Sequence, residues 1–172
     1  IFRIDEKSER VPLTIAGYDR EKGTVSIIFQ KVGFTTKALG ELNEGDYIRD
    51  FVGPLGKPTD VEGKKRVCVV GGGVGCAIAY PIAKEMHKLG IDVTFIAGFR
   101  SADIVILKDE LKEASNKLII CTDDGSYGEH GFRADEVLNV IALVQAAEHF
   151  GRQADLLEDD RNGALLAFRI QM

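Results

Sequence analysis

The stretch from residue 67 to residue 75 reads VCVVGGGVG and has the composition of a nucleotide-phosphate site. A short run rich in β-branched residues stops at the glycines, and residues 76–89 then show helical spacing. Glycines let a backbone approach a pyrophosphate closely, and the free N–H groups of a first helical turn attract the anion. A tight strand-to-helix connection also needs glycine for positive φ, so the turn by itself leaves both interpretations open.

Polar side chains follow each of the next two strands that the pattern predicts. Arg100 lies in the segment GFRS, and Asp123 and Asp124 lie in the segment TDDGS. Because ligands of parallel sheets bind at the carboxyl ends of the strands, both segments are candidate site loops. Two adjacent carboxylates suit ribose hydroxyls and repel a 2′-phosphate, which favours NAD(H) over NADP(H) unless Arg100 reaches the same position. The alternative is that DDGS is ordinary turn chemistry.

A second candidate site lies near the N-terminus. Arg10 and Thr14 place a cation and a hydroxyl at the start of a predicted strand, and the turn from Gly33 to Thr36 leads into a helix. Such groups can hold a second phosphate-bearing ligand. Taken alone, these residue types favour the alternative of an edge-strand arginine and a helix-capping threonine.

The remaining reactive side chains indicate no further chemistry. Cys76 opens a helix, where the dipole can lower a thiol pKa, but we interpret it as a small packing residue that lines the site. Cys68, Cys76 and Cys121 are scattered singly, which is typical of a reducing cytoplasm, and three thiols are too few for a four-thiolate cluster. The histidines share no metal-ligand spacing, and no Ser/His/Asp grouping indicates a hydrolase. We therefore expect no metal site.

Composition narrows the class of protein further. The chain has 172 residues, a net charge of −5 and ordinary globular composition, which does not favour nucleic-acid binding. It contains no apolar run long enough for a membrane span. The first residues form neither a signal peptide nor an initiator methionine, so we expect this sequence to be the middle of a longer chain.

Two domains are predicted, separated by the Gly/Pro-rich stretch at residues 53–58. Residues 1–56 read as part of an antiparallel barrel, with strands at residues 11–16, 24–31 and 47–52, a hairpin turn at 19–23 and a short helix at 37–42. Residues 62–172 read as an α/β domain, in which a parallel sheet is covered by flanking helices. Its strands are expected at residues 66–70, 92–97 and 117–121, and its helices at 76–89, 102–114 and 134–150. Residues 151–172 form an atypical tail.

The motifs in order are RVPLT, GxxT, VGPLGKP, GGGVG, GFRS and TDDGSYGxxGF. Their combination resembles the ferredoxin–NADP reductase superfamily. Within it, the chain looks most like the electron-transfer subunits of dihydroorotate dehydrogenase and the small subunits of NADH-dependent ferredoxin–NADP oxidoreductases, also known as sulfide dehydrogenases. The resemblance covers residues 1–143.

This resemblance implies FAD on the barrel, NAD(H) on the α/β domain, and hydride transfer from nicotinamide to flavin N5. Electrons then pass to the redox centre of a partner subunit in a hetero-oligomer, and the scattered cysteines place it in the cytoplasm. It also implies site roles: Thr14, the catalytic candidate, would approach flavin N5. The other flavin positions are Arg10, Pro12, Leu13, Phe29, Gly33 and Thr36, and the NAD(H) positions are Gly72, Gly73, Val74, Gly75, Arg100, Asp123 and Asp124.

Two departures from the family pattern accompany the resemblance. The first barrel strands are missing, and so is the C-terminal segment whose cysteines bind a [2Fe–2S] cluster in full-length relatives, so the chain looks truncated at both ends. We therefore expect no cluster on this chain. Two other functions are left open by the sequence: a non-catalytic nucleotide-binding or assembly subunit on the same fold, and a sugar-nucleotide or NADP-dependent enzyme that uses only the α/β half.

Overall fold

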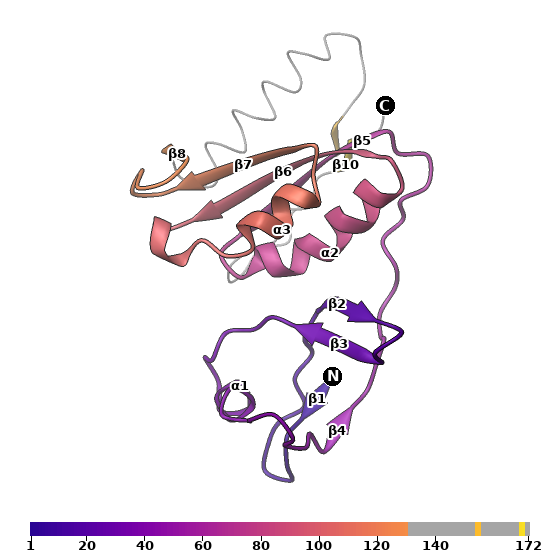
Figure 1. The fold of residues 1–172 in the computed structure, drawn as a ribbon, viewed down its shortest axis with the longest axis vertical. Coiled ribbons are helices and arrows are strands. Elements are labelled where there is room, and N and C mark those ends of the chain that lie inside the picture. Colours follow the sequence, from indigo (N-terminus) through magenta and orange to yellow (C-terminus); the bar gives the residue numbers. More distant parts are fainter. Residues whose placement is uncertain (131–153, 156–168, 171–172) are drawn as a thin grey trace. The chain divides into compact units, whose positions relative to one another are not determined.

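The computed structural model describes residues 1–130, 154–155 and 169–170. The chain divides into two compact units, Ile1–Asp60 and Val61–Met172, and each unit is described by itself (Figure 1). The helix expected at residues 134–150 lies outside the described residues, as does most of the atypical tail. The fold class expected from the sequence is confirmed, because a parallel sheet with helices follows a set of short antiparallel strands.

The first unit is built from short antiparallel pairs of strands. Strand β1 pairs with β4, with Phe2 opposite Phe51, and the two rings stack with their centroids 4.7 Å apart. Strand β2 pairs with β3 in a hairpin. The elements are β1 (Phe2–Arg3), β2 (Ile15–Asp19), β3 (Thr24–Ile27), α1 (Phe34–Leu39) and β4 (Asp50–Phe51).

The hairpin that the sequence predicts around residues 19–23 is present. The Asp19 carboxylate accepts hydrogen bonds from the amides of Glu21 and Lys22, at 3.0 and 3.1 Å, and so stabilises the turn. The strand expected at residues 11–16 is shorter, since only Ile15 and Ala16 belong to β2. Proline has no N–H group to donate to a ladder, and Pro12 follows the single bridge that Val11 makes with Phe2.

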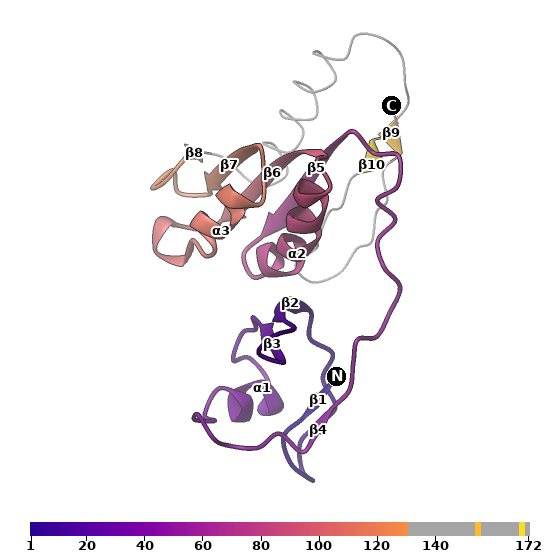
Figure 2. The ribbon, with the colours of Figure 1, turned by 45° about the vertical axis from the view of Figure 1, so that its right-hand side comes forward.

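The second unit contains a parallel sheet with the strand order β5-β6-β7-β8 among the described residues. Helices α2 and α3 lie together against one of its faces (Figures 1 and 2). The tail contributes one antiparallel pair, β9 with β10. The elements are β5 (Arg66–Gly72), α2 (Gly75–Lys88), β6 (Asp92–Phe99), a 3₁₀ turn (Ala102–Ile104), α3 (Lys108–Glu113), β7 (Lys117–Thr122), β8 (Glu129–His130), β9 (Ala154–Asp155) and β10 (Arg169–Ile170).

Alternation along the strands produces two apolar clusters, one on each face of the sheet. The larger cluster joins β6 side chains to the small residues of α2, which allow the helix to approach the sheet closely. Its members include Val67, Ala79, Ala83, Val93, Phe95, Phe99 and Leu111. The smaller cluster consists of Cys68, Val70, Ile96 and Cys121. Because β5, β6 and β7 pair in parallel, the loops that follow them meet at one edge of the sheet.

The single helix expected at residues 102–114 is split into two shorter helical pieces. A 3₁₀ turn ends at Ile104, and α3 begins only at Lys108. Between them, Val105, Ile106 and Leu107 pack against the larger apolar cluster, and Leu107 has a left-handed backbone with φ of 57°. Burial of this apolar run therefore overrides the helical spacing of the sequence.

Candidate functional site at the sheet edge

The glycine-rich turn joins β5 to α2, and two of its glycines are explained by packing. A Cβ atom on Gly71 would lie 2.8 Å from the Cys76 Cα atom, so only glycine lets the strand pass this close to the helix. Gly73 has φ of 53°, a left-handed conformation that favours glycine. Its N–H group donates to the Gly98 carbonyl oxygen at 2.8 Å, which ties this turn to the end of β6.

The next two residues supply groups that fit a phosphate. The amides of Val74 and Gly75 donate to no acceptor in the described part of the chain. A Cβ atom on Gly75 would meet nothing within 4 Å, so there is open space beside the start of α2. Helix α2 has 14 residues, and its N-terminus carries a partial positive charge. Free donors, open space and a helix N-terminus together fit the pyrophosphate of a dinucleotide.

The cysteines serve the core. Cys76 is fully buried in the larger cluster, in agreement with its interpretation as a packing residue. Burial raises the pKa of the Cys68 thiol to about 11. None of the three cysteines forms a disulfide bond.

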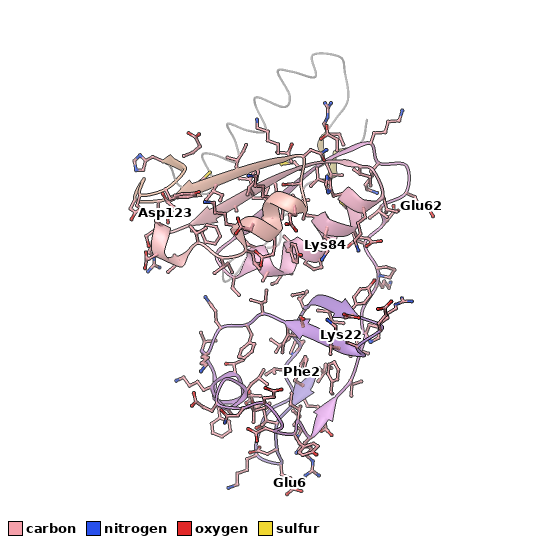
Figure 3. All side chains as sticks on the ribbon, viewed as in Figure 1. Phe2, Glu6, Lys22, Glu62, Lys84 and Asp123 are labelled. Atoms are coloured by element: carbon pink, nitrogen blue, oxygen red, sulfur yellow. The ribbon has the colours of Figure 1, made fainter. Side chains whose placement is uncertain are left out.

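The two polar loops predicted from the sequence lie next to each other at the carboxyl edge of the sheet. The Asp123 amide donates to the Phe99 carbonyl at 3.0 Å, and the Asp124 amide donates to the Arg100 carbonyl at 3.3 Å. Figure 3 shows Asp123 at this edge, where β7 ends. The structure therefore brings the loop that contains Arg100 against the loop that contains the two aspartates.

The two aspartates have different environments. Asp124 Oδ1 accepts hydrogen bonds from the Ser126 hydroxyl at 2.6 Å and from the Ser126 amide at 3.0 Å. These bonds lower the pKa of the Asp124 carboxyl. The Asp123 side chain is half-buried, and its carboxylate has no hydrogen-bond or ion-pair partner among the described residues. Asp123 is therefore the carboxylate of the pair that has no partner within the described residues, whereas Asp124 is bonded through Oδ1.

Several residues that hold this loop in shape are missed by the sequence analysis. The buried Thr122 hydroxyl donates to the Tyr127 carbonyl at 2.8 Å and accepts from the Tyr127 amide at 3.0 Å, which closes the base of the loop. Lys108 Nζ lies 4.8 Å from the centre of the Tyr127 ring, and its hydrogen bond with Tyr127 raises the Lys108 pKa. A Cβ atom on Gly128 would collide with the Ile120 carbonyl oxygen. In the sequence, the glycine of the segment SYG was the signal that could have predicted this close approach of the loop to β7.

In the first unit, the residue before Arg10 is joined to the first turn of α1 by a contact that the sequence analysis also misses. Thr35 is buried, and its hydroxyl oxygen accepts from the Glu9 amide at 3.0 Å and donates to the Glu9 carbonyl at 3.4 Å. Because Arg10 directly follows Glu9, this contact ties the backbone next to Arg10 to the first turn of α1. The repeated threonine in GFTT was the signal for it.

The first turn of α1 retains donors that fit a phosphate group. Thr36 Oγ1 accepts from the Val32 and Gly33 amides at 3.1 and 2.9 Å, so its hydroxyl stabilises the helix end itself. The amides of Phe34, Thr35 and Thr36 have no acceptor within the part of the chain that the structure describes. The Arg10 side chain is largely exposed, 3.8 Å from the Asp50 carboxylate. These groups offer a cation and amide donors to an anion, but only weakly, since α1 has six residues.

The remaining flavin candidates lie at the open end of the β2–β3 hairpin. Pro12 and Leu13 belong to the extended segment before β2, and Thr14 directly precedes Ile15, whose register partner is Ile27. Phe29 follows Ile27 by two residues and is half-buried. The Thr14 side chain is exposed, and its hydroxyl has no hydrogen-bond partner among the described residues.

The short antiparallel strands followed by a parallel sheet with a glycine turn define a ferredoxin reductase-like module. A solved structure of an NADH-dependent reduced ferredoxin-NADP oxidoreductase, described for flavin-based electron bifurcation, superimposes with a TM-score of 0.76. The match has 38% sequence identity and covers 81% of this chain and 50% of that one. At 38% identity, the similarity extends to the sequence as well as to the fold.

Curated relatives place the chain more narrowly. It is 45% identical over 135 residues to a dihydroorotate dehydrogenase B (NAD(+)) electron transfer subunit homolog of Thermotoga maritima, covering 78% of this chain and 48% of the relative. It is 49% identical over 148 residues to an uncharacterized protein of the adh 3′ region of Clostridium beijerinckii, covering 82% of this chain and 50% of that relative. No protein-family model matches the chain. The resemblance to dihydroorotate dehydrogenase electron-transfer subunits is confirmed.

The named relatives are an electron transfer subunit homolog and an NADH-dependent reduced ferredoxin-NADP oxidoreductase, so the named proteins that this chain resembles act in electron transfer. The chain spans about half the length of the curated relatives it matches. Within the described residues, no helix is long and apolar enough to cross a membrane. The same residues contain no group of three or more metal-ligating side chains that could hold an ion.

Proposed function

We propose that this chain is a flavin-dependent electron-transfer module that passes hydride from NADH to FAD and then electrons to a redox centre of a partner subunit. The observation that carries the proposal is the 45% identity to an electron transfer subunit homolog of dihydroorotate dehydrogenase B (NAD(+)). The α/β unit would bind the dinucleotide, and the N-terminal unit would bind the flavin.

For NADH, the proposed ligands come from the carboxyl edge of the sheet. The turn from Gly72 to Gly75 would hold the pyrophosphate through the free amides of Val74 and Gly75. Asp123 would accept hydrogen bonds from the adenosine ribose hydroxyls, with Arg100 on the neighbouring loop. An unpaired carboxylate at this position repels a 2′-phosphate, so NADH is the preferred donor.

For FAD, the proposed ligands are Arg10 and the first turn of α1 for the phosphates, with Pro12, Leu13 and Phe29 beside the ring system. Thr14 would donate a hydrogen bond near flavin N5, a role that its exposed hydroxyl can fill. The flavin supplies the conversion between two-electron and one-electron transfer when it is bound. The side chains then need only to orient the ligands and exclude water, which agrees with the lack of an acid–base pair in the sequence.

The partner is proposed to be the electron-accepting subunit of a hetero-oligomer, as the names of the relatives suggest for those proteins. We place the complex in the cytoplasm, because buried cysteines without disulfide bonds suit a reducing compartment.

Ligand binding tests the proposal. The purified chain is incubated with FAD and desalted, and its visible absorbance is recorded; NADH and NADPH are then titrated separately. The proposal predicts a yellow protein that binds NADH more tightly than NADPH. Folded protein that binds NADH and stays colourless with FAD would instead support a non-catalytic nucleotide-binding subunit. Tighter binding of NADPH would support an NADP-dependent enzyme.

A further inference from the structure

The loop after β7 and the loop after β6 are connected by one side chain, Ser126. Its hydroxyl oxygen lies 2.6 Å from Asp124 Oδ1 and 2.8 Å from the Ala102 amide nitrogen. A carboxylate only accepts hydrogen bonds, so the Ser126 proton must point to Asp124. The oxygen lone pairs are thereby left for the Ala102 N–H group. The direction of both hydrogen bonds is thus determined by the charge on Asp124.

The ends of this hydrogen-bond chain flank the candidate ribose ligands. Ala102 follows Arg100 by two residues, and Asp124 directly follows Asp123. Besides Ser126, the two loops are joined by backbone bonds from Asp123 to Phe99 and from Asp124 to Arg100. The backbone bonds set the loops side by side, and the Ser126 hydroxyl holds their outer parts at a defined separation.

The rest of the loop is also bonded internally. Thr122 closes the base of the loop through both backbone polar atoms of Tyr127, and Lys108 lies over the Tyr127 ring. Asp124 accepts two hydrogen bonds from Ser126 through Oδ1. This leaves Asp123 as the half-buried carboxylate without a partner among the described residues. A loop held in this way from within is preorganised, with Asp123 as its unpartnered carboxylate.

We propose that Ser126 and Asp124 are positioning residues that hold Asp123 and Arg100 in the geometry that recognises the adenosine ribose of NADH. Asp124, which its sequence position alone presents as a ribose ligand, acts through Ser126 and does not touch the nucleotide. The inference rests on the proposed function, because it assumes that the α/β unit binds NADH.

The test compares Ser126→Ala with Ser126→Thr in the full chain. Alanine removes the hydroxyl, whereas threonine retains it and serves as the matched control. Dissociation constants are measured for NADH, for ADP-ribose and for reduced nicotinamide mononucleotide, which lacks the adenosine half. Thermal unfolding of each variant shows whether a loss of binding merely reflects a loss of folded protein.

We expect Ser126→Ala to raise the dissociation constants of NADH and ADP-ribose by about fivefold, which is the effect of losing one solvent-accessible hydrogen bond. Binding of reduced nicotinamide mononucleotide and the unfolding temperature should not change, and Ser126→Thr should restore affinity. Unchanged NADH affinity in Ser126→Ala, or equal weakening of all three ligands, would overturn the positioning role alone. A wild-type chain that is folded and binds neither NADH nor ADP-ribose would overturn the proposed function and this inference together.

Discussion

The buried hydroxyl of Thr35 is hydrogen-bonded to both backbone polar atoms of Glu9, 26 residues earlier in the chain. This contact ties the segment that leads into the proposed flavin strand to the first turn of α1. It is one of the few side-chain links between distant parts of the first unit.

We predict that Thr35→Val destabilises the first unit, because the Glu9 amide and carbonyl lose their partner in a buried site. The expected loss in free energy of unfolding is about 1–3 kcal/mol. Urea unfolding followed by circular dichroism measures it, with Thr14→Val as the matched control. Thr14 is exposed and has no hydrogen-bond partner among the described residues, so its replacement should leave stability unchanged. Equal stability of both variants would show that the Thr35 contact contributes nothing.

Two glycines of the nucleotide turn should respond in opposite ways to alanine. In Gly71→Ala the new Cβ would lie 2.8 Å from the Cys76 Cα atom, so β5 and α2 must separate at a cost of about 1–3 kcal/mol. In Gly75→Ala the new Cβ meets nothing within 4 Å, so the fold should be retained. The added methyl group would occupy the proposed pyrophosphate space and weaken NADH by about tenfold or more. If Gly75→Ala binds NADH as wild type does, the pyrophosphate is placed wrongly.

Asp123 should control the choice between NADH and NADPH. Asp123→Asn removes the negative charge and keeps the size of the side chain. The variant should therefore bind NADH more weakly and NADPH more tightly. We expect the dissociation constant of NADPH divided by that of NADH to fall by about tenfold, as measured by equilibrium titration. Asp124→Asn should change this ratio less, because Asp124 is bonded to Ser126. A larger effect at Asp124 would reverse the assignment of the two carboxylates.

The same hydrogen bonds predict how ADP-ribose binding depends on pH. The Ser126 hydroxyl and amide stabilise the charged Asp124, so its folded pKa lies below the ordinary value of 3.8. The stabilisation of the folded loop by the charged Asp124 is complete above the ordinary pKa of 3.8. It is lost as the pH falls through the lower pKa of the folded protein. ADP-ribose affinity should therefore show no step caused by Asp124 between about pH 5 and 8. Titrations across this range, with Asp124→Asn as reference, check it; a wild-type step that the variant lacks would contradict the account.

Much of the second unit could be predicted from the sequence, because its strands and α2 have clear apolar periodicity. The strands expected at residues 66–70, 92–97 and 117–121 correspond to β5, β6 and β7, which extend slightly further. The continuous helix expected at 102–114 was wrong in part: it is interrupted at Val105–Leu107, because the packing of these residues on the core is a tertiary effect that local spacing does not show. Likewise, the sequence shows that Asp123 and Asp124 share one loop, but it does not show which of the two accepts hydrogen bonds from Ser126.

The first unit could be predicted less well. Its strands are short and irregular, and the contact of Thr35 with Glu9 joins segments that no local pattern connects. The FAD and NAD(H) roles of the individual residues remain predictions, since they rest on the family resemblance and on free donors and acceptors.

The central claim is that NADH reduces FAD on this chain, and anaerobic stopped-flow spectroscopy tests it most directly. FAD-loaded protein is mixed with NADH, with NADPH or with NADH labelled by deuterium at the transferred position. We predict that NADH bleaches the visible flavin absorbance in one rapid phase, that NADPH does so more slowly, and that deuterium slows the reaction. A bound flavin that stays oxidised in excess NADH would contradict the account.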